Sequence, residues 1–328
     1  MSTKSLRTAY GETLVELGRT DERIVVLEAD LGKSTMSILF QQAFPDRFFE
    51  MGIAEQNMAS TAAGLALTGK IPFMSTFAVF ASGRAYDQLR QTISIARLNV
   101  KICGSSSGLS DFGDGSTHQA IEDVAIMRAI PNMTVLVPVD AVETRKMVAA
   151  MVEWPGPVYL RINRNDLPIY TADDASYRIG RLHPVRDGRD VVVFANGVMV
   201  SKAIAAADAL AREGVSVKVV NVSTVKPLDR DAVLADAKGC KAVVTAEEHS
   251  IIGGLGSAIA EALRGNTGQP IEFVGIDDCF GTSAHGYDEL LAHYRLTPEA
   301  IADAARSVLR LPAGSSSGVR QLPRAANS

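Results

Sequence analysis

The sequence predicts an α/β protein with mainly parallel sheets, because short β-branched runs alternate with alanine-rich helical stretches along almost the whole chain. Several of these runs are apolar at every position rather than at alternate positions. That pattern is expected of parallel strands covered by helices on both faces. The expected strands are, in chain order, residues 24–27, 71–74, 100–104, 134–138, 158–162, 191–195, 215–221, 241–246 and 271–276.

Helical stretches separate these strands. Between the second and third strands, apolar residues recur at a spacing close to the helical period, at Phe77, Phe80, Ala81, Leu89, Ile93 and Ala96. Strand–helix–strand repetition places a sheet between two layers of helices. We therefore expect three-layer αβα domains.

The length of 328 residues favours two such domains. The strand–helix alternation breaks after Pro168, where a polar stretch without clear periodicity begins. We expect an N-terminal domain over 1–168, a linker over 169–188 and a second domain over 189–311. The remaining segment, 312–328, contains Gly-Ser-Ser-Ser-Gly and few core-forming residues, so we expect a disordered tail there.

Composition narrows the class of protein. Hydrophobic residues make up 47% and charged residues 21%, which excludes a disordered chain, a coiled coil and a disulfide-rich miniprotein. The net charge of −4 predicts no general affinity for nucleic acid or anionic membranes, and no run approaches the roughly 20 apolar residues of a membrane span. The N-terminus lacks the apolar core of a secretory signal. Three widely spaced cysteines without a CxxC pair predict reduced thiols and a cytoplasmic protein.

The first candidate site is the polar loop 104–119, between a buried strand and a helix. Structureless loops of this length in compact domains are often functional. The loop carries His118, one of five histidines, together with Asp111 and Asp114. Alternatively, Ser116 and Gln119 fit a capping box that would only begin the next helix.

A magnesium site is not predicted in this loop. Gly113-Asp114-Gly115 looks like the start of a diphosphate–magnesium motif, but that motif needs an asparagine pair further along the chain. Asn132 comes too early and no pair follows. No cluster of histidines or cysteines elsewhere has the spacing of metal ligands.

Glu55 is the second candidate. It stands where an expected strand leads into an alanine-rich helix through Ala59, Ala62, Ala63 and Ala66. In one interpretation Glu55 only stabilises the first helical turn through the helix dipole. In the other it is a carboxylate among apolar neighbours, suited to proton transfer. The residues around it favour the first interpretation.

Two further patterns give weaker signals. Glycines within 247–257 follow an expected strand and could admit an anion at a helix N-terminus, but they match neither GxGxxG nor a Walker loop. A tight structural turn explains them equally well. Four arginines near expected element ends could each bind a phosphate, although most arginines are solvated surface residues. They are Arg7, Arg84, Arg161 and Arg164.

Six segments together carry a resemblance to a known family. They are Ala29-Asp30-Leu31, Gly52 to Gln56, Ser75-Thr76-Phe77, Asp114 to Glu122, Arg164 to Pro168, and Glu248 to Gly256. In this order, and up to about residue 310, the chain resembles the C-terminal half of the transketolase family. The resemblance implies a pyrimidine-binding domain followed by a transketolase C-terminal domain. It also implies that Glu55 is a catalytic carboxylate rather than a capping residue.

Family members use thiamine diphosphate, and the resemblance covers no domain for its diphosphate and Mg²⁺. It therefore implies one subunit of a split transketolase, completed by an N-terminal-type subunit in an α2β2 assembly. The implied reaction moves a two-carbon ketol unit from a ketose, expected to be phosphorylated, to an aldose. The alternatives are the β subunit of a thiamine-dependent 2-oxo acid dehydrogenase, a non-catalytic paralogue and a generic nucleotide-binding module.

The resemblance also assigns roles to single residues. Glu55, with Gln56 beside it, contacts the aminopyrimidine ring of the cofactor, which Phe77 and Phe80 enclose. Asp114 and His118 contact the hydroxyl groups of the sugar substrate, and His118 is also catalytic. A sugar phosphate is held by Arg7, Ser34 and Arg164.

Two departures from the family pattern stand out. Ser106 occupies the place of a usual substrate-contacting histidine, and we expect it to alter sugar recognition because serine supplies no cationic donor. Gly83 replaces a third aromatic residue of the pyrimidine pocket, unless Tyr86 fills the gap from the next turn.

Overall fold

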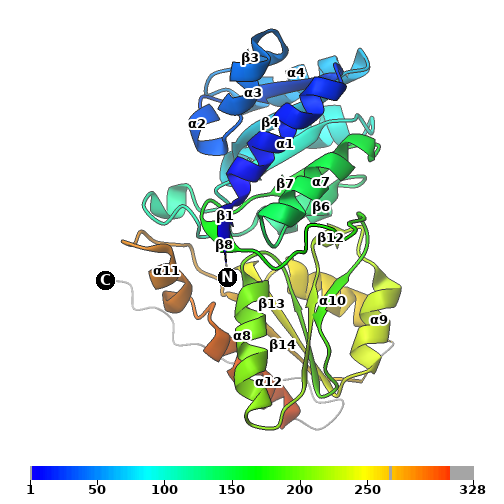
Figure 1. The fold of residues 1–328 in the computed structure, drawn as a ribbon, viewed down its shortest axis with the longest axis vertical. Helices are drawn as coiled ribbons and strands as arrows, with labels where there is room; N and C mark the ends of the chain where they lie inside the picture. Colours follow the sequence, from blue (N-terminus) through cyan, green and yellow to red (C-terminus); the bar gives the residue numbers. More distant parts are fainter. Residues whose placement is uncertain (1, 266–267, 311–328) are drawn as a thin grey trace.

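Two large sheets, each flanked by helices, form the molecule, which confirms the predicted α/β class (Figure 1). The computed structural model describes residues 2–265 and 268–310. In Figure 1 the N-terminal half of the chain, coloured blue to green, lies above the half coloured green to red. The tail expected over 312–328 lies outside the described residues.

The first sheet has seven strands in the order β12-β6-β7-β5-β4-β2-β3. They are β2 (Ile24–Glu28), β3 (Phe48–Glu50), β4 (Ile71–Phe77), β5 (Lys101–Ser105), β6 (Thr134–Leu136), β7 (Val158–Arg161) and β12 (Thr224–Lys226). All neighbours are parallel except β12, which runs antiparallel to β6. Strands β2, β4 and β5 are buried at every position, as their apolar runs predict.

Helices cover both faces of this sheet. Helices α1 (Leu6–Thr20) and α7 (Ala141–Glu153) share one apolar core, which includes Tyr10 and Met147. Helices α4 (Glu55–Leu67) and α6 (Asp123–Ala129) contribute Met58 and Met127 to a second core. The remaining helical segments are α2 (Gly32–Thr35), α3 (Ile38–Ala43), η1 (Pro45–Arg47), η2 (Phe80–Arg84), α5 (Tyr86–Gln88), η3 (Leu89–Ser94) and η4 (Gly115–Thr117).

The second sheet has five strands in the order β14-β13-β10-β11-β9. They are β9 (His183–Arg186), β10 (Val191–Ala195), β11 (Val217–Asn221), β13 (Ala242–Ser250) and β14 (Ile271–Ile276). Only β9 is antiparallel to its neighbour. The helices of this half are α8 (Met199–Ala211), α9 (Arg230–Lys238), α10 (Leu255–Leu263), α11 (Tyr287–His293) and α12 (Pro298–Leu309).

Short strands lie near the junction of the two halves of the chain, and one of them, β12, links the halves. β1 (Thr3–Ser5) pairs with β8 (Asp166–Pro168) near the junction visible in Figure 1. Strand β12 follows the second sheet's β11 in sequence but joins the first sheet. Strand β9 lies within 169–188, where a linker is expected, so this segment contributes an edge strand to the second sheet. The domain boundaries themselves stay a prediction.

None of the helices within the described ranges has both the length and the apolar character that crossing a membrane requires.

Candidate functional site

An aromatic cluster lies beyond the carboxyl end of β4. Phe77 ends this strand and Phe80 begins η2, and their rings stack with centroids 6.1 Å apart and planes 11° from parallel. The His118 ring meets both edge-on, at 6.2 Å from Phe77 and 5.4 Å from Phe80. The fold therefore brings together three residues that the sequence analysis selected from two separate segments. This is also the end of the sheet where ligands bind in parallel α/β folds.

Glu55, at the start of α4, is linked to this cluster through Arg84. Its side chain is 1% exposed, and both carboxylate oxygens accept hydrogen bonds from Arg84 Nη1 at 3.0 Å. The Arg84 guanidinium in turn lies 4.6 Å from the centroid of the Phe80 ring, a cation–π distance. Glu55 therefore combines its position in the first helical turn with a specific ion pair. Gln56, the next residue of α4, is exposed.

Arg84 is a site residue that sequence reasoning did not single out. It appeared there only as one of several arginines that could bind phosphate. Its spacing of four residues from Phe80 was the available signal, because residues four apart share one face of a helix. Nothing in the sequence identified Glu55, 29 residues earlier, as its partner.

Gly83, where the family pattern has a third aromatic residue, borders open space. A Cβ added there would meet no atom within 4 Å. Tyr86 packs against the core that contains Met58 and Met127. Gly83 is therefore open to solvent, and Tyr86 does not fill this position.

A basic cluster adjoins the aromatic one. The Arg164 guanidinium lies 5.9 Å from the centroid of the Phe77 ring, and its Nη1 donates to Asp111 Oδ2 at 2.8 Å. Arg7 Nη1 donates to the Ser34 backbone carbonyl at 2.6 Å. Burial, followed by repulsion from Arg164, lowers the pKa of Arg7. Two guanidinium groups close enough to repel each other form a favourable site for a phosphate.

Asp114 and His118 stand on the exposed side of the loop. Asp114 is exposed and His118 is half-buried, with its Nδ1 hydrogen-bonded to the Thr117 hydroxyl at 2.9 Å. Both are near Asp111. Burial raises the pKa of Asp111 above its ordinary value. Arg164 and His118 act in the opposite direction, and Asp114 adds to the rise. The loop therefore presents a carboxylate and an imidazole next to the basic cluster.

The capping-box interpretation of this loop is wrong. Helix α6 begins at Asp123, and Gln119 instead donates through its amide to the carbonyl oxygens of Asp111 and Thr282, at 3.3 and 2.9 Å. Gly115 has a φ of +73°, and a Cβ there would collide with Ser283. The loop is therefore held against a segment of the second half of the chain.

Ser106 is placed differently from the other predicted site residues. It follows β5 directly, is fully buried and has a φ of +52°. Its hydroxyl has no hydrogen-bond partner among the described residues. In this structure the side chain is therefore closed off from solvent.

The glycines around 253–256 serve a structural purpose. Glu247 accepts hydrogen bonds from the backbone N–H groups of Leu255 and Gly256, at 2.6 and 2.8 Å. A Cβ at Gly254 would collide with the same carboxylate. The anion that a helix N-terminus attracts is therefore supplied by the protein itself.

Arg161 is a structural residue as well. Its Nε donates to both carboxylate oxygens of Asp123, at 3.0 and 2.9 Å, and its Nη2 donates to the Glu248 carbonyl at 2.9 Å. Glu248 in turn accepts from the Leu109 N–H at 2.8 Å. This buried network joins the polar loop to β13, so Arg161 is not available to a phosphate.

Glu28 positions the segment that contacts Arg7. Its Oε2 accepts from the hydroxyls of Thr35 and Ser37, at 2.8 and 2.5 Å, and Ser34 lies in the same segment. Burial raises the pKa of Glu28 to about 7. The folded protein therefore holds a proton on Glu28 between its ordinary pKa and about pH 7, a range in which the unfolded chain has lost it.

We expect Glu28 to make the protein less stable as the pH rises from about 5 to 8. The glutamine variant, Glu28→Gln, has no carboxyl to ionise. Between pH 5 and 8 the free energy of unfolding, measured in urea, should therefore fall by up to about 3 kcal/mol more in the wild type than in this variant. A difference between the two proteins that stays constant from pH 5 to 8 would contradict the raised pKa.

No group of three or more histidine, cysteine, aspartate or glutamate side chains suited to a metal ion occurs within residues 2–265 and 268–310.

Comparisons with known proteins match most of the chain. The family model described as "Transketolase, pyrimidine binding domain" matches residues 2–169, and "Transketolase, C-terminal domain" matches residues 180–301. A Methanocaldococcus jannaschii protein named as a transketolase C-terminal section is 45% identical over 91% of this chain and 94% of its own length. The 6-deoxy-6-sulfo-D-fructose transketolase subunit of Clostridium sp. strain MSTE9 is 43% identical over 92% and 94%.

Two further relatives differ from each other in how much of their own length the match covers. Human transketolase is 36% identical over 92% of this chain, but the match spans only 49% of the human protein. A solved structure described as a split gene transketolase, in an inactive β4 tetramer, is 46% identical. It superimposes with a TM-score of 0.86 over 94% of this chain and 99% of its own.

Proposed function

The chain belongs to the transketolase family as a split-type subunit, and from that premise we propose that it is the C-terminal subunit of a two-chain, thiamine-diphosphate-dependent transketolase. The enzyme transfers a two-carbon ketol unit from a ketose to an aldose. One observation carries the proposal: a buried carboxylate, Glu55, pairs with Arg84, whose guanidinium lies over the Phe80 ring of the stacked Phe77–Phe80 pair.

The residues present fit the pyrimidine end of the cofactor. A planar heterocycle needs an aromatic wall and a partner for its ring nitrogen, and the chain supplies both. Gly83, three residues after Phe80, borders open space, and Arg84 lies over the Phe80 ring. When bound, thiamine diphosphate supplies the electron sink for cleaving the carbon–carbon bond beside the ketose carbonyl.

Each cluster has a task in this proposal. Glu55 holds a proton at the ring nitrogen of the aminopyrimidine, and Phe77 and Phe80 exclude water from that ring. Asp114 and His118 orient the sugar hydroxyls from the exposed edge of the loop. Arg7 and Arg164 hold the substrate phosphate, with Ser34 fixing Arg7 through its carbonyl.

A partner chain completes the site. The match spans about half of human transketolase, and the described residues offer no metal cluster, so we assign the diphosphate and Mg²⁺ to an N-terminal-type subunit. The similar split-gene protein forms an inactive tetramer of β chains, which supports a requirement for a second kind of chain. We place both chains in an α2β2 assembly, and in the cytoplasm because Cys103, Cys240 and Cys279 are free thiols.

The direct test is a ketol-transfer assay on the chain co-purified with an N-terminal-type subunit. We expect transfer from xylulose 5-phosphate or another ketose phosphate only when thiamine diphosphate and Mg²⁺ are both present. Transfer that persists after both are removed by dialysis against chelator would refute the proposal. Decarboxylation of a 2-oxo acid without ketol transfer would identify the dehydrogenase alternative instead.

Ser106 provides a test of sugar specificity. A histidine tolerates the left-handed backbone at this position better than most residues do. Ser106→His replaces this buried hydroxyl with a longer side chain that should reach past the closed position, supply a cationic donor and raise the kcat/KM ratio of phosphorylated to unphosphorylated ketoses by about tenfold or more. The measurement is a panel of both kinds of ketose on wild type and variant. An ordinary preference for xylulose 5-phosphate that is unchanged in the variant would rule out a role for Ser106.

A further inference from the structure

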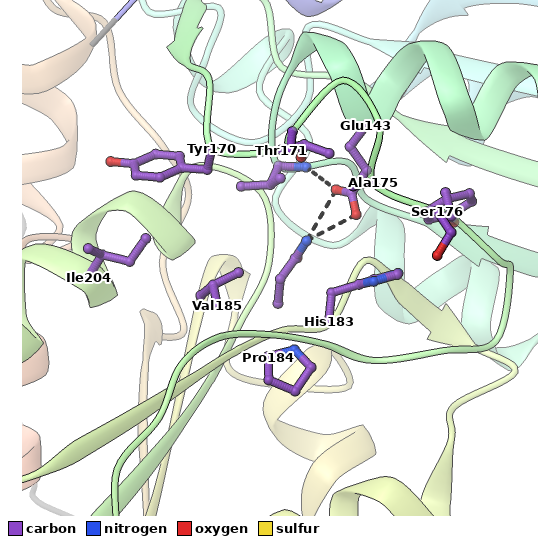
Figure 2. Close-up of a pocket in the computed structure, with 13 residues that line it drawn as sticks. Glu143, Tyr170, Thr171, Ala175, Ser176, His183, Pro184, Val185 and Ile204 are labelled. Atoms are coloured by element: carbon purple, nitrogen blue, oxygen red, sulfur yellow. Dashed lines mark hydrogen bonds between the residues drawn. The ribbon is translucent and has the colours of Figure 1, made fainter.

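A cavity lies at the seam between the two halves of the chain, and none of its lining residues belongs to the proposed active site. Its volume is about 330 Å³, within the range of pockets for small molecules. Helix α7 of the first half contributes Glu143, while β9, β11 and α8 of the second half contribute His183, Asn221 and Ile204. The rest of the lining consists of Val139, residues 170–172 and 175–177, Pro184 and Val185. Figure 2 shows these side chains around the space.

The polar groups at this cavity are mainly hydrogen-bond acceptors. Glu143 accepts from the Val139 N–H at 2.7 Å and from Asn221 Nδ2 at 3.0 and 3.2 Å, the contacts dashed in Figure 2. A carboxylate has about four acceptor positions, so it retains capacity for another donor. Asn221 Oδ1 and His183 Nε2 are buried atoms without a partner in the described part of the chain. Asn221 itself is only 2% exposed.

Charge at the cavity is of one sign. Glu143 is the one charged residue among the described residues that line it, and no lysine or arginine joins them. Burial raises the pKa of Glu143 to about 7, so the group is only partly ionised near neutral pH, and no cation among the lining residues stabilises its charge. Burial lowers the pKa of His183, which keeps its imidazole neutral and able to accept. An anion would meet this carboxylate without compensation.

The walls are apolar and aromatic. Pro184, Val185 and Ile204 line one side, and the Tyr177 and His183 rings stack at 5.6 Å and 22°. Such walls accommodate a hydrocarbon or aromatic body. A purely apolar ligand would leave the acceptor atoms without hydrogen-bond donors, which lowers its binding free energy.

We propose that this cavity binds a small organic ammonium compound, whose N–H groups donate to Glu143, Asn221 Oδ1 and His183 Nε2 while its apolar body lies against Val185 and Ile204. The ammonium group supplies the donors and the positive charge that the acceptor set lacks. Because both halves of the chain line the cavity, the ligand bridges them. The site is independent of ketol transfer, so each proposal stands or fails separately.

The test compares 2-phenylethylamine with 2-phenylethanol, which has the same carbon skeleton without the charge. Binding to the full chain, and to its complex with the partner subunit, is measured by calorimetry and by saturation-transfer NMR. The amine should bind at least about tenfold more tightly than the alcohol, as a charge-assisted contact predicts. Glu143→Gln should remove that advantage and leave the alcohol unchanged. The control is Glu153→Gln, an exposed carboxylate on the same helix, which should leave amine binding unchanged.

A second variant tests the cavity without altering its charge. Val185→Trp fills the space from a 40% exposed position of the edge strand β9, so it should abolish amine binding while the melting temperature stays close to that of the wild type. If Glu143→Gln does not fold, Val185→Trp decides the matter. Equal affinity for amine and alcohol, an equal loss in Glu153→Gln, or full amine binding in Val185→Trp would each overturn the proposal.

Discussion

Glu55→Gln is expected to lower the ketol-transfer rate of the reconstituted two-chain enzyme by about 10²–10⁴-fold, the usual contribution of a positioned acid–base group. Glutamine keeps the size of the side chain but cannot hold an ionisable proton at the ring nitrogen. Arg84, which then loses its anionic partner, is 46% exposed in its side chain and can be hydrated. The fold and the assembly should therefore survive the change.

The measurement is steady-state ketol transfer, with subunit assembly checked by size-exclusion chromatography. Glu16→Gln is the matched control, because Glu16 is an exposed glutamate on α1. Activity of Glu55→Gln within a factor of a few of the control would remove Glu55 from the proposed chemistry.

The second large effect is on stability. Asp123→Ala should lower the free energy of unfolding by about 3–5 kcal/mol, because it leaves the buried Arg161 guanidinium without a counter-charge. The aspartate also accepts from the Tyr159 hydroxyl at 2.8 Å, so the variant loses that hydrogen bond as well. Since Arg161 donates to the Glu248 carbonyl, the contact between the polar loop and β13 should weaken too.

Urea denaturation of single and double variants checks this prediction. Removing both charges, in Asp123→Leu with Arg161→Met, should restore much of the stability, because no unpaired charge stays buried. If Asp123→Ala lowers the free energy of unfolding by less than about 1 kcal/mol, the buried pair is contradicted. The same holds if the double variant loses as much stability as Asp123→Leu and Arg161→Met lose together when each is made alone.

The strands that the sequence predicted are those whose residues are apolar throughout. Each of β2, β4, β10 and β13 contains a buried run, so its burial can be inferred without knowing its neighbours. The missed strands are short and depend on distant partners. Strand β12 exists because β6, from the other half of the chain, pairs with it. Strand β9 is an edge strand with Pro184 in it, a residue that argues against strand in a sequence pattern.

The helix expected after β4 was only partly correct. The pattern starting at Phe77 is apolar at helical spacing, but Phe77 ends β4, and the following segment contains π-helical turns over Phe80–Arg84 and Leu89–Ser94. Hydrophobic spacing cannot distinguish such turns from a regular helix. π-helical turns often occur at functional sites, and here one of them carries both Phe80 and Arg84.

In the candidate site too, single residues could be selected from the sequence but their contacts with distant residues could not. The resemblance to the transketolase family selected the segments that carry Glu55, Phe77, His118 and Arg164, and the fold brings Phe77 close to the His118 ring and the Arg164 guanidinium. The partners of these side chains could not be inferred, because they come from elsewhere in the chain. Arg84 pairs with Glu55, and Glu247 supplies the anion for the glycines of α10. A local pattern shows that a charge is present but not which opposite charge meets it.

A titration of the two chains against each other tests the central claim most directly. The purified chain is held at constant concentration with thiamine diphosphate and Mg²⁺, and the N-terminal-type subunit is added while ketol transfer is followed. We predict no transfer by either chain alone, a rise with added partner, and a plateau at equimolar chains. Sustained turnover by this chain alone, or a rate that does not change as the partner is added, would contradict a shared active site.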